Sequence, residues 1–250
     1  MPKFDDLSII VCSRKDSAGL KTTLKSLECL NNYHFELILV LSDYSQNEIN
    51  NIRLSIKTNR LIILEMPASG IYEAMNYGIS KVTREYILCL NGGDSIFSPR
   101  NLEKLLAKIA DKPWGYGAIS IVNPEDEKKA RKYNFFPYFR LLHKLSLKYV
   151  PHPSTIYRTD FLKSLGQFDT SYRIAADQKL ALLASKKIRP INSNLIISKF
   201  IGGGKSDNRS AFEIVEDFRN ISSEIDGIFL KNQKFDKLIW SLLLDRKSVV

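Results

Sequence analysis

The 250-residue chain is 44% apolar and 26% charged, which is the composition of an ordinary soluble globular protein and excludes disorder, collagen and coiled coil as descriptions of the whole chain. Its 37 Lys and Arg residues exceed its 27 Asp and Glu residues and leave a formal net charge of +10. This excess favours a polyanionic partner, namely nucleic acid, an anionic bilayer or a phosphorylated small molecule, and charge alone does not select among them.

Cysteine usage and the N-terminal sequence indicate an intracellular protein. Cys12 and Cys89 each lie inside an apolar run, and the chain has three cysteines in all, so we expect buried reduced thiols and a reducing compartment. The first residues, MPKFDDLSIIV, lack the plan of a signal peptide, and no window holds the roughly 20 uninterrupted apolar residues that a membrane span needs. We therefore expect a cytoplasmic protein that does not span a membrane.

The first 120 residues alternate short apolar runs rich in β-branched residues with stretches of helical periodicity, which is typical of βαβ units on a parallel sheet. Ser98 as N-cap and Pro99 at the first helical position mark the start of one helix. Strands are predicted over residues 7–12, 35–41, 61–64, 86–90 and 117–122, and helices over 19–30, 71–82 and 99–110.

The composition changes after Asn123. From residue 128 to residue 158 the chain contains no acidic residue, and aromatic and basic residues are interleaved up to residue 148. Two interpretations of residues 128–148 stay open: a solvated loop and helix, or a surface on anionic lipid with Phe135, Phe136 and Phe139 in the interface. Strands are predicted over 155–157 and 195–200, helices over 159–165 and 177–186, and an amphipathic helical pattern over 210–245. The apolar residues of 229–250 suit core packing, a dimer contact or a membrane contact.

Polar side chains follow three of the predicted parallel strands. Open α/β sheets bind ligands just outside the carboxyl ends of their strands, so these residues are expected to meet at one edge. Each loop alone resembles any polar connection, but together they favour a nucleotide site. The residues are Ser13, Arg14, Lys15 and Asp16 after the first strand, Ser42, Asp43, Tyr44 and Ser45 after the second, and Asn91, Gly92, Gly93 and Asp94 after the fourth.

The turn LCLNGGDS, residues 88–95, places an acidic residue beside two glycines at the end of a buried strand. A carboxylate there suits Mg²⁺ or Mn²⁺, which would bridge a diphosphate, although the letters NGGD also suit a simple tight turn. No GxGxxG follows the first strand and no GxxxxGK[ST] occurs, so neither a dinucleotide fold nor a P-loop NTPase is supported.

Two long segments of the chain resemble inverting, family-two glycosyltransferases of the GT-A fold. Residues 70–94, GIYEAMNYGISKVTREYILCLNGGD, resemble the region that typically reads GIYDAMNKGI and then GEYI-FLNSGD in these enzymes. Residues 152–180, HPSTIYRTDFLKSLGQFDTSYRIAADQKL, resemble their acceptor-side segment, which usually ends IAADYDL. FIGGGKSD, residues 200–207, is similar to the F–GGxS element of the bacterial polysaccharide branch, and the whole similarity covers about residues 7–207.

The resemblance implies roles for individual residues. Asp177, in the AAD triplet, becomes the general base, and Asp94 becomes the carboxylate of the DXD-like motif, which holds a divalent cation, Mg or Mn, at the diphosphate. The base and ribose are contacted near Ser13 and Asp43. The full set of implied nucleotide- and substrate-binding positions is Ser13, Arg14, Asp43, Gly70, Glu73, Asn76, Asn91, Gly92, Gly93 and His152.

The sequence departs from the pattern of this family in three places, one of which is a pair of residues. Asn91 stands where a full DXD motif has its first Asp, which leaves the strength of the metal dependence open. Ser42 and Asp43 replace the commoner Asp-Gly or Asp-Asp pair, which leaves the base contact open. Pro153 follows His152 where Gln is usual, so His152 is carried over only as an active-site neighbour.

The resemblance also implies the fold. We expect an α/β GT-A domain over residues 1–207, with a Rossmann-like, mostly parallel central sheet flanked by helices. Its nucleotide-sugar half spans about 1–122 and its acceptor half about 123–207. Residues 208–250 would form a C-terminal helical appendage.

The expected activity is inverting transfer of a hexosyl or N-acetylhexosaminyl group from a nucleotide-diphosphate sugar, with a UDP-sugar favoured. The expected acceptor is a polyprenyl-diphosphate-linked glycan in the assembly of a bacterial surface polysaccharide. This places the protein on the cytoplasmic side, peripheral to the inner face of the cell membrane, with an anionic membrane surface and no nucleic acid as partner. One positioned carboxylate is enough to activate the acceptor hydroxyl for a single displacement.

Two other functions remain as alternatives. A nucleotidyltransferase acting on sugar phosphates also combines an α/β sheet with metal-bound carboxylates, but it predicts a Gly-rich basic loop after the first strand, which SRKDSAGLK fits poorly. A basic nucleic-acid-binding module requires positive charge on one face of the sheet domain, whereas much of the charge here follows residue 127.

Overall fold

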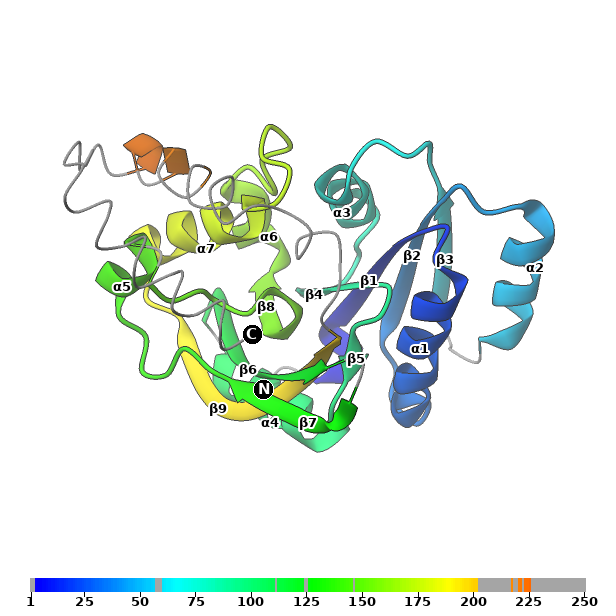
Figure 1. Cartoon of the computed structure of the whole chain (residues 1–250), viewed down its shortest axis with the longest axis horizontal. Helices are drawn as coiled ribbons and strands as arrows, with labels where there is room; N and C mark the ends of the chain where they lie inside the picture. Colours follow the sequence, from blue (N-terminus) through cyan, green and yellow to red (C-terminus); the bar gives the residue numbers. More distant parts are fainter. Residues whose placement is uncertain are drawn as a thin grey trace.

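The computed structural model describes residues 3–56, 60–110, 112–123, 126–145 and 147–201, together with 217, 220, 221 and 223–225. Within these residues, nine strands form one mixed sheet (Figure 1). They are β1 (Leu7–Arg14), β2 (Glu36–Ser42), β3 (Arg60–Glu65), β4 (Tyr86–Asn91), β5 (Ser95–Ile96), β6 (Trp114–Asn123), β7 (Asp126–Tyr133), β8 (Thr155–Arg158) and β9 (Ile191–Ile201).

The order of the strands across the sheet is β3-β2-β1-β4-β8-β6-β9-β5, with β7 paired to β6. The first four of these neighbours run parallel, as the alternating apolar runs predict. β8 is antiparallel to both β4 and β6, whereas β9 runs parallel to β6. The sheet is therefore mixed and mostly parallel, with β5, β7 and β8 running opposite to the other six strands.

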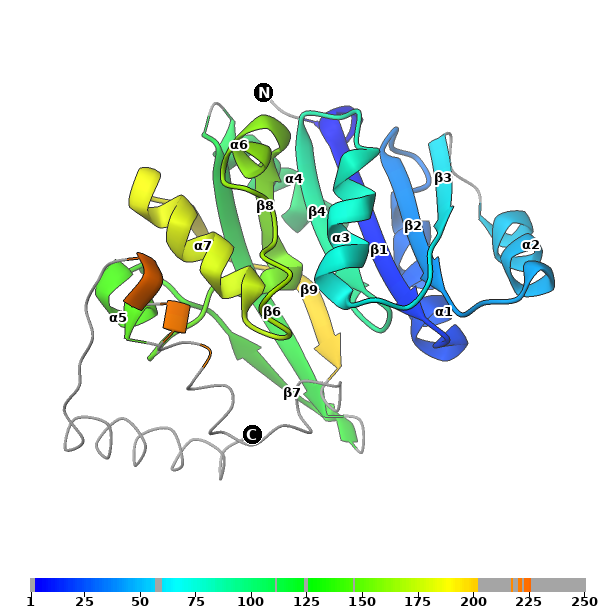
Figure 2. The same ribbon diagram turned by 90° about the horizontal axis from the view of Figure 1, so that it is seen from above.

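Helices cover both faces of the sheet. α3, α6 and α7 lie on one face, whereas α1, α2 and α4 pack with the other, which gives a three-layer α/β sandwich (Figure 2). The helices are α1 (Ser17–Leu27), α2 (Gln46–Ser55), α3 (Ile71–Ser80), α4 (Pro99–Ile109), α5 (Arg140–Lys144), α6 (Thr159–Ser164) and α7 (Ala176–Lys187), with 3₁₀ turns at Phe4–Asp6, Glu28–Leu30 and His152–Ser154.

The side chains on the two faces of each central strand belong to two separate apolar clusters. In β1, Ile10 and Cys12 face the layer of α3 and α7, whereas Ile9 and Val11 face the layer of α1 and α4. This is why the central strands read as continuous apolar runs: both sides of each strand are covered. Gly78 lets α3 approach the sheet closely, because a Cβ at this position would lie 2.7 Å from Cγ2 of Ile10.

Polar side chains cap the N-termini of α1 and α4. The Ser98 hydroxyl accepts a hydrogen bond from the Asn101 N–H at 3.4 Å, which confirms the predicted N-cap of α4. Asp16 caps α1 by accepting a hydrogen bond from the Gly19 N–H at 2.9 Å. These caps satisfy backbone N–H groups that have no partner inside the helix.

The basic segment after Asn123 differs from its prediction. Its first part is strand β7, an antiparallel partner of β6, and the short helix α5 follows. The lipid interpretation placed Phe135 in the interface, but Phe135 is only 2% exposed and packs against Tyr138 with ring centroids 5.0 Å apart. Phe136 and Phe139 are exposed, as that interpretation requires. β7 was missed because its sequence, DEKKARKY, has no apolar run for a pattern to detect.

The predicted C-terminal helical pattern over 210–245 lies mostly outside the described residues. Of the few that are described, Ile221 and Ile225 pack against Ala175 and Leu182. Glu224 also contacts Lys179 on α7, with 2.5 Å between Oε1 and Nζ. Among the residues placed in the structure, no helix is both long and apolar enough to cross a membrane.

Candidate active site

The connections of the sheet change direction between β1 and β4. From β1 the chain moves outward to β2 and β3, and it then returns to place β4 on the other side of β1, where Cys12 pairs with Asn91. In open α/β sheets the crevice at such a point, outside the carboxyl ends of the strands, is where ligands bind. The candidate residues after β1, β2 and β4 all lie at this edge.

The ends of β1 and β2 are joined by side chains of the predicted site. The Arg14 guanidinium forms an ion pair with Asp43 at 2.8 Å, and both side chains remain well exposed. Ser13 is buried, and its hydroxyl lies 2.7 Å from the Tyr44 hydroxyl. Tyr44 also accepts a hydrogen bond from the Asp16 N–H at 3.1 Å. Tyr44, which the sequence places among the polar residues after the second strand but to which it gives no role, therefore organises the loop that carries Ser13 and Arg14.

The turn after β4 is held by a ring of backbone and side-chain hydrogen bonds. The Gly93 N–H donates to the Thr23 hydroxyl and to the Gly19 carbonyl, so α1 packs directly on the turn. Gly93 has φ of 103°, a left-handed conformation that favours glycine. Asp94 is 3% exposed, and its carboxylate accepts the Asn91 N–H at 2.8 Å. Burial raises the pKa of Asp94 to about 7, against the lowering effect of this hydrogen bond.

The same turn offers two side chains with oxygen atoms that suit a divalent cation. The Asn91 side-chain Oδ1 is buried and has no hydrogen-bond partner among the described residues. This oxygen and the Asp94 carboxylate are hard donors of the type that Mg²⁺ and Mn²⁺ prefer, and such cations commonly use one or two carboxylates plus substrate phosphates. The described part of the chain contains no cluster of three or more His, Cys, Asp or Glu residues. The residues present therefore fit a cation shared with a diphosphate, and they do not form a cage around a permanently bound metal.

The first turn of α3 lies at the same edge of the sheet. Gly70 is the N-cap of the helix, and the Glu73 carboxylate folds back against it. The Asn76 amide is engaged with the backbone of Phe168: its Nδ2 donates to the Phe168 carbonyl at 2.8 Å and its Oδ1 accepts the Phe168 N–H at 3.1 Å. Asn76 thus fixes the loop that leads to Asp177.

Asp177 stands in the first turn of α7 and is held from two sides. Its Oδ1 accepts a hydrogen bond from the Tyr72 hydroxyl at 2.9 Å, and its Oδ2 accepts one from the Gln178 amide at 2.8 Å. Tyr72 belongs to α3, and its single hydroxyl proton is shared between Oδ1 of Asp177 and the carbonyl of Ile174. Burial, together with the charge of Asp177, raises the pKa of the Tyr72 hydroxyl well above its usual range, so this group stays a proton donor to the carboxylate.

His152 lies beside the same carboxylate. Its ring is partly exposed and meets Phe168 edge-on at 5.7 Å, but its Nε2 is buried and has no hydrogen-bond partner among the described residues. Burial lowers the pKa of His152, and the charge of Asp177 opposes that shift. A neutral imidazole with an unused nitrogen is suited to bind a hydroxyl group.

Sequence reasoning selected Asp177 and His152 but not the residues that hold them. Tyr72 and Gln178 escaped because nothing in their own patterns distinguishes them from buried core positions. Both residues lie inside the two segments that resemble family-two glycosyltransferases, and this resemblance was the signal that could have identified them. Chemically, the edge combines an oriented carboxylate that can accept a proton with a second carboxylate near backbone N–H groups, which suits transfer of a group from a charged donor.

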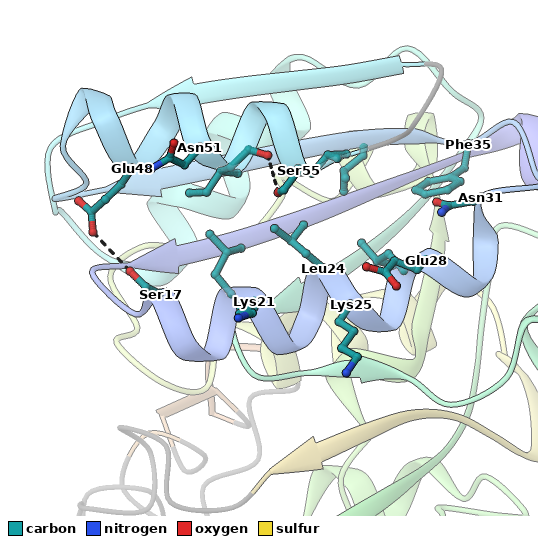
Figure 3. A pocket seen from close by; sticks show the side chains of 15 residues that line it. Ser17, Lys21, Leu24, Lys25, Glu28, Asn31, Phe35, Glu48, Asn51 and Ser55 are labelled. Carbon is teal, nitrogen blue, oxygen red and sulfur yellow. Dashed lines mark hydrogen bonds between the residues drawn. The ribbon is translucent and has the colours of Figure 1, made fainter.

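A separate groove of about 640 Å³ lies between α1 and α2 (Figure 3). Leu24 and Phe35 form part of its apolar floor, Lys21 and Lys25 extend beside it, and Ser17 donates to Glu48 at 3.4 Å at one end. None of the predicted site residues lines this groove. The candidate active site is therefore assigned to the strand ends and not to this groove.

Solved structures with similar folds are glycosyltransferases. Residues 1–349 of S. aureus TarS in complex with UDP-GlcNAc superpose with a TM-score of 0.68 at 18% identity, covering 97% of this chain and 73% of that one. The mannosyltransferase PcManGT from Pyrobaculum calidifontis, in complex with GDP-Man and Mn²⁺, gives 0.58 at 17% identity over 78% and 56% of the two chains. The fold is thus the GT-A, Rossmann-like α/β fold.

Sequence comparison places the chain within one family of this fold. The profile of Glycosyl transferase family 2 matches residues 8–166, and the chain belongs to that family. An uncharacterized glycosyltransferase of Mycobacterium tuberculosis is 21% identical over 220 residues, which is 86% of this chain and 82% of the relative. A PGL/p-HBAD biosynthesis glycosyltransferase of the same species is 26% identical over 172 residues, 68% and 66% of the two chains.

Proposed function

We propose that the protein transfers a sugar from a nucleotide-diphosphate sugar to a glycan acceptor with inversion of configuration, and that Asp177 is the general base. The observation that carries this proposal is the Asp177 carboxylate, which is fixed by Tyr72 and Gln178 at the edge where parallel α/β sheets bind ligands. A base held in one orientation suits a single displacement, because the acceptor hydroxyl must lose its proton as it attacks.

The donor nucleotide is proposed to bind at the ends of β1, β2 and β4. The exposed ion pair of Arg14 and Asp43 offers a guanidinium group and a carboxylate that would contact the base and the ribose, next to Ser13. Asp94 and Asn91 would hold Mg²⁺ or Mn²⁺ at the diphosphate, where the cation supplies positive charge to the leaving group. A UDP-sugar is favoured, in line with the UDP-GlcNAc complex of the similarly folded TarS.

The sugar is proposed to lie between the donor site and Asp177. The first turn of α3, with Gly70 and Glu73, is at the same edge and connects to Asp177 through Tyr72. His152 offers its unused Nε2 beside the Asp177 carboxylate. In this arrangement residues 1–122 form the nucleotide-sugar half and 123–207 the acceptor half of one domain, with 208–250 as an appendage.

We further propose that the acceptor is a glycan carried on a lipid diphosphate at an anionic membrane. Residues 136–148, here called the apolar-basic segment, expose Phe136 (55%), Phe139 (54%) and Leu141 (64%). Arg140, Lys144 and Lys148 lie between and after them, which is the pattern of an interfacial segment that meets acidic headgroups. The same segment contributes His143, which contacts Gln178 next to Asp177.

This arrangement would bring a lipid-linked acceptor to the base from the membrane side. The biological setting we propose is assembly of a bacterial surface polysaccharide or glycolipid, on the inner face of the cell membrane. The curated PGL/p-HBAD biosynthesis relative supports a role of this kind.

A donor panel tests the proposal. UDP-Glc, UDP-Gal, UDP-GlcNAc and GDP-Man would each be added to the protein with and without Mn²⁺, and the melting temperature recorded, because a ligand that binds the native state raises it. We expect one UDP-sugar to give the largest shift, and Mn²⁺ to increase that shift. No shift with any nucleotide sugar, with or without Mn²⁺, would contradict the proposed function.

A further inference from the structure

The side chain of Gln178, directly after Asp177 on α7, uses both ends of its amide. Its Oε1 accepts the Val150 N–H at 3.1 Å, and its Nε2 donates to the Val150 carbonyl at 2.9 Å. The same Nε2 donates to Oδ2 of Asp177 at 2.8 Å, and Oε1 lies 3.0 Å from Nε2 of His143. Gln178 is only 7% exposed, so these contacts are made away from solvent.

The Val150 backbone determines which way the Gln178 amide points. A backbone N–H only donates and a carbonyl only accepts, so Oε1 must face the Val150 N–H and Nε2 must face the Val150 carbonyl. A flipped amide would place Nε2 against the Val150 N–H, and Oε1 against both the Val150 carbonyl and the Asp177 carboxylate. One N–H of Gln178 is therefore directed at Asp177 and the other at the Val150 carbonyl, so Val150, two residues before His152, is bound to the first turn of α7.

His143 reinforces this orientation from α5. Because Oε1 of Gln178 can only accept, Nε2 of His143 carries the proton, and Nδ1 accepts from the Tyr138 hydroxyl at 3.1 Å. His143 is fully buried, and burial lowers its pKa to about 4, which keeps the ring neutral in the single tautomer that this chain of contacts requires. The hydrogen-bond direction therefore runs from Tyr138 through His143 and Gln178 to Asp177.

We propose that Gln178 is a positioning residue for the Asp177 carboxylate, and that His143 fixes Gln178 in the orientation that does so. This inference rests on the proposed role of Asp177 as base. With Tyr72 on Oδ1 and Gln178 on Oδ2, the carboxylate has one donor per oxygen from two different helices and cannot rotate freely. One lone pair on each oxygen stays available to take the acceptor proton, in a geometry set before the substrate binds.

The test uses Gln178→Leu and Gln178→Glu in the full chain. Turnover is followed as UDP release from the UDP-sugar that the donor panel selects, starting with UDP-GlcNAc, and rates are corrected for the fraction of protein that binds UDP. For Gln178→Leu we expect kcat to fall on the order of ten- to a hundredfold with little change in donor KM, because a hydrogen bond to a charged group is lost. Gln178→Glu keeps the size of the side chain. If Gln178→Leu does not fold, the kinetics of Gln178→Glu alone decide the test.

The pH dependence of kcat separates positioning from a merely structural role. In Gln178→Glu a second carboxyl replaces the donor beside Asp177, and like charges at this distance raise the pKa of one member of the pair. We therefore expect the acidic limb of the kcat profile to move upward by about one pH unit. A structural effect alone would lower the melting temperature and the active fraction, and would leave the limb and the corrected kcat in place.

Ser198→Ala is the matched control, because it removes a buried hydroxyl that bonds to Ser154 at 2.8 Å and has no recorded contact with Asp177. We expect Ser198→Ala to lower the melting temperature without moving the acidic limb of the kcat profile. Unchanged corrected kcat and an unchanged limb in both Gln178 variants, with Asp177→Asn inactive, would overturn the positioning role and keep the base. An active Asp177→Asn enzyme would instead overturn the proposed base.

Discussion

The Asp177 carboxylate accepts a hydrogen bond from the Tyr72 hydroxyl at 2.9 Å, although 105 residues separate the two along the chain. Tyr72 lies in the helix after β3, and Asp177 lies in the first turn of α7, so this bond joins α3 to α7 at the carboxyl edge of the sheet. The backbone N–H groups of Ala176 and Asp177 also lower the pKa of Tyr72, which places its hydroxyl at the start of α7. The start of α7 is therefore fixed by a side chain from α3.

Tyr72→Phe removes this bond while keeping the ring. We expect a loss of about 1–3 kcal/mol in the free energy of unfolding, because the hydroxyl is buried and its partners lose a donor. We also expect kcat to fall while UDP affinity stays unchanged. Urea unfolding and UDP release measure the two effects. Tyr77→Phe, at a half-exposed tyrosine on the same helix, is the control, and equal effects in the two variants would contradict the role given to Tyr72.

Asp94→Asn tests the cation site with little risk to the fold. The amide oxygen can still accept the Asn91 N–H, and burial already disfavours the charged carboxylate, so stability should hold. Without the charge, we expect UDP binding to lose its dependence on Mn²⁺. Isothermal calorimetry with UDP, with and without Mn²⁺, measures this. Full Mn²⁺ dependence in Asp94→Asn would show that the cation is held elsewhere.

The apolar-basic segment predicts binding to anionic vesicles. Each basic residue near the surface should contribute on the order of 1 kcal/mol, which added salt weakens. The double change Phe136→Ser and Phe139→Ser should reduce co-sedimentation with phosphatidylglycerol vesicles. Leu54→Ser, at an 83% exposed leucine on α2, is the control and should bind like the unchanged protein. Equal binding to neutral and anionic vesicles, or binding to neither, would return the segment to a solvated loop and helix.

His143 predicts a pH dependence of stability. Its pKa is lowered to about 4 in the folded protein by burial, whereas an unfolded histidine titrates near 6.5. Between these values the unfolded chain binds more protons, so the free energy of unfolding should decrease as pH falls from about 6.5 to about 4, by up to about 3 kcal/mol. Urea unfolding across this range should show a shallower decrease for His143→Gln than for the exposed control His34→Gln. An equal decrease in the free energy of unfolding for the two variants would show that His143 is not the source of this pH dependence.

Much of the fold could be predicted from the sequence, because covered parallel strands leave long apolar runs. The runs that became β1, β2 and β4 and the cap at Ser98 are of this kind. β7 could not be found this way, because an edge strand of charged residues is stabilised by its pairing with β6 and not by an apolar face. The same reason explains Phe135: whether an aromatic residue in a basic segment faces inward depends on partners such as Tyr138, which lie in the fold and not in the pattern.

The candidate site divides in the same way. Polar residues after parallel strands predicted where Ser13, Asp43 and Asp94 would meet, since topology alone brings strand ends together. The residues that orient Asp177 were not predictable by this route. Tyr72 reaches Asp177 through a contact between two helices, and Gln178 acquires its direction only from the Val150 backbone. Their roles depend on tertiary packing, and a local pattern does not encode it.

The most direct test of the central claim is the stereochemistry and base dependence of transfer. The unchanged enzyme and Asp177→Asn would be compared by proton NMR of the anomeric signal of the product, with donor affinity measured in parallel. We expect product with the configuration opposite to that of the donor, and an Asp177→Asn variant that binds donor normally but turns over about a hundred- to ten-thousandfold more slowly. Retention of configuration, or near-unchanged turnover by Asp177→Asn, would contradict the claim that Asp177 is the base of an inverting transfer.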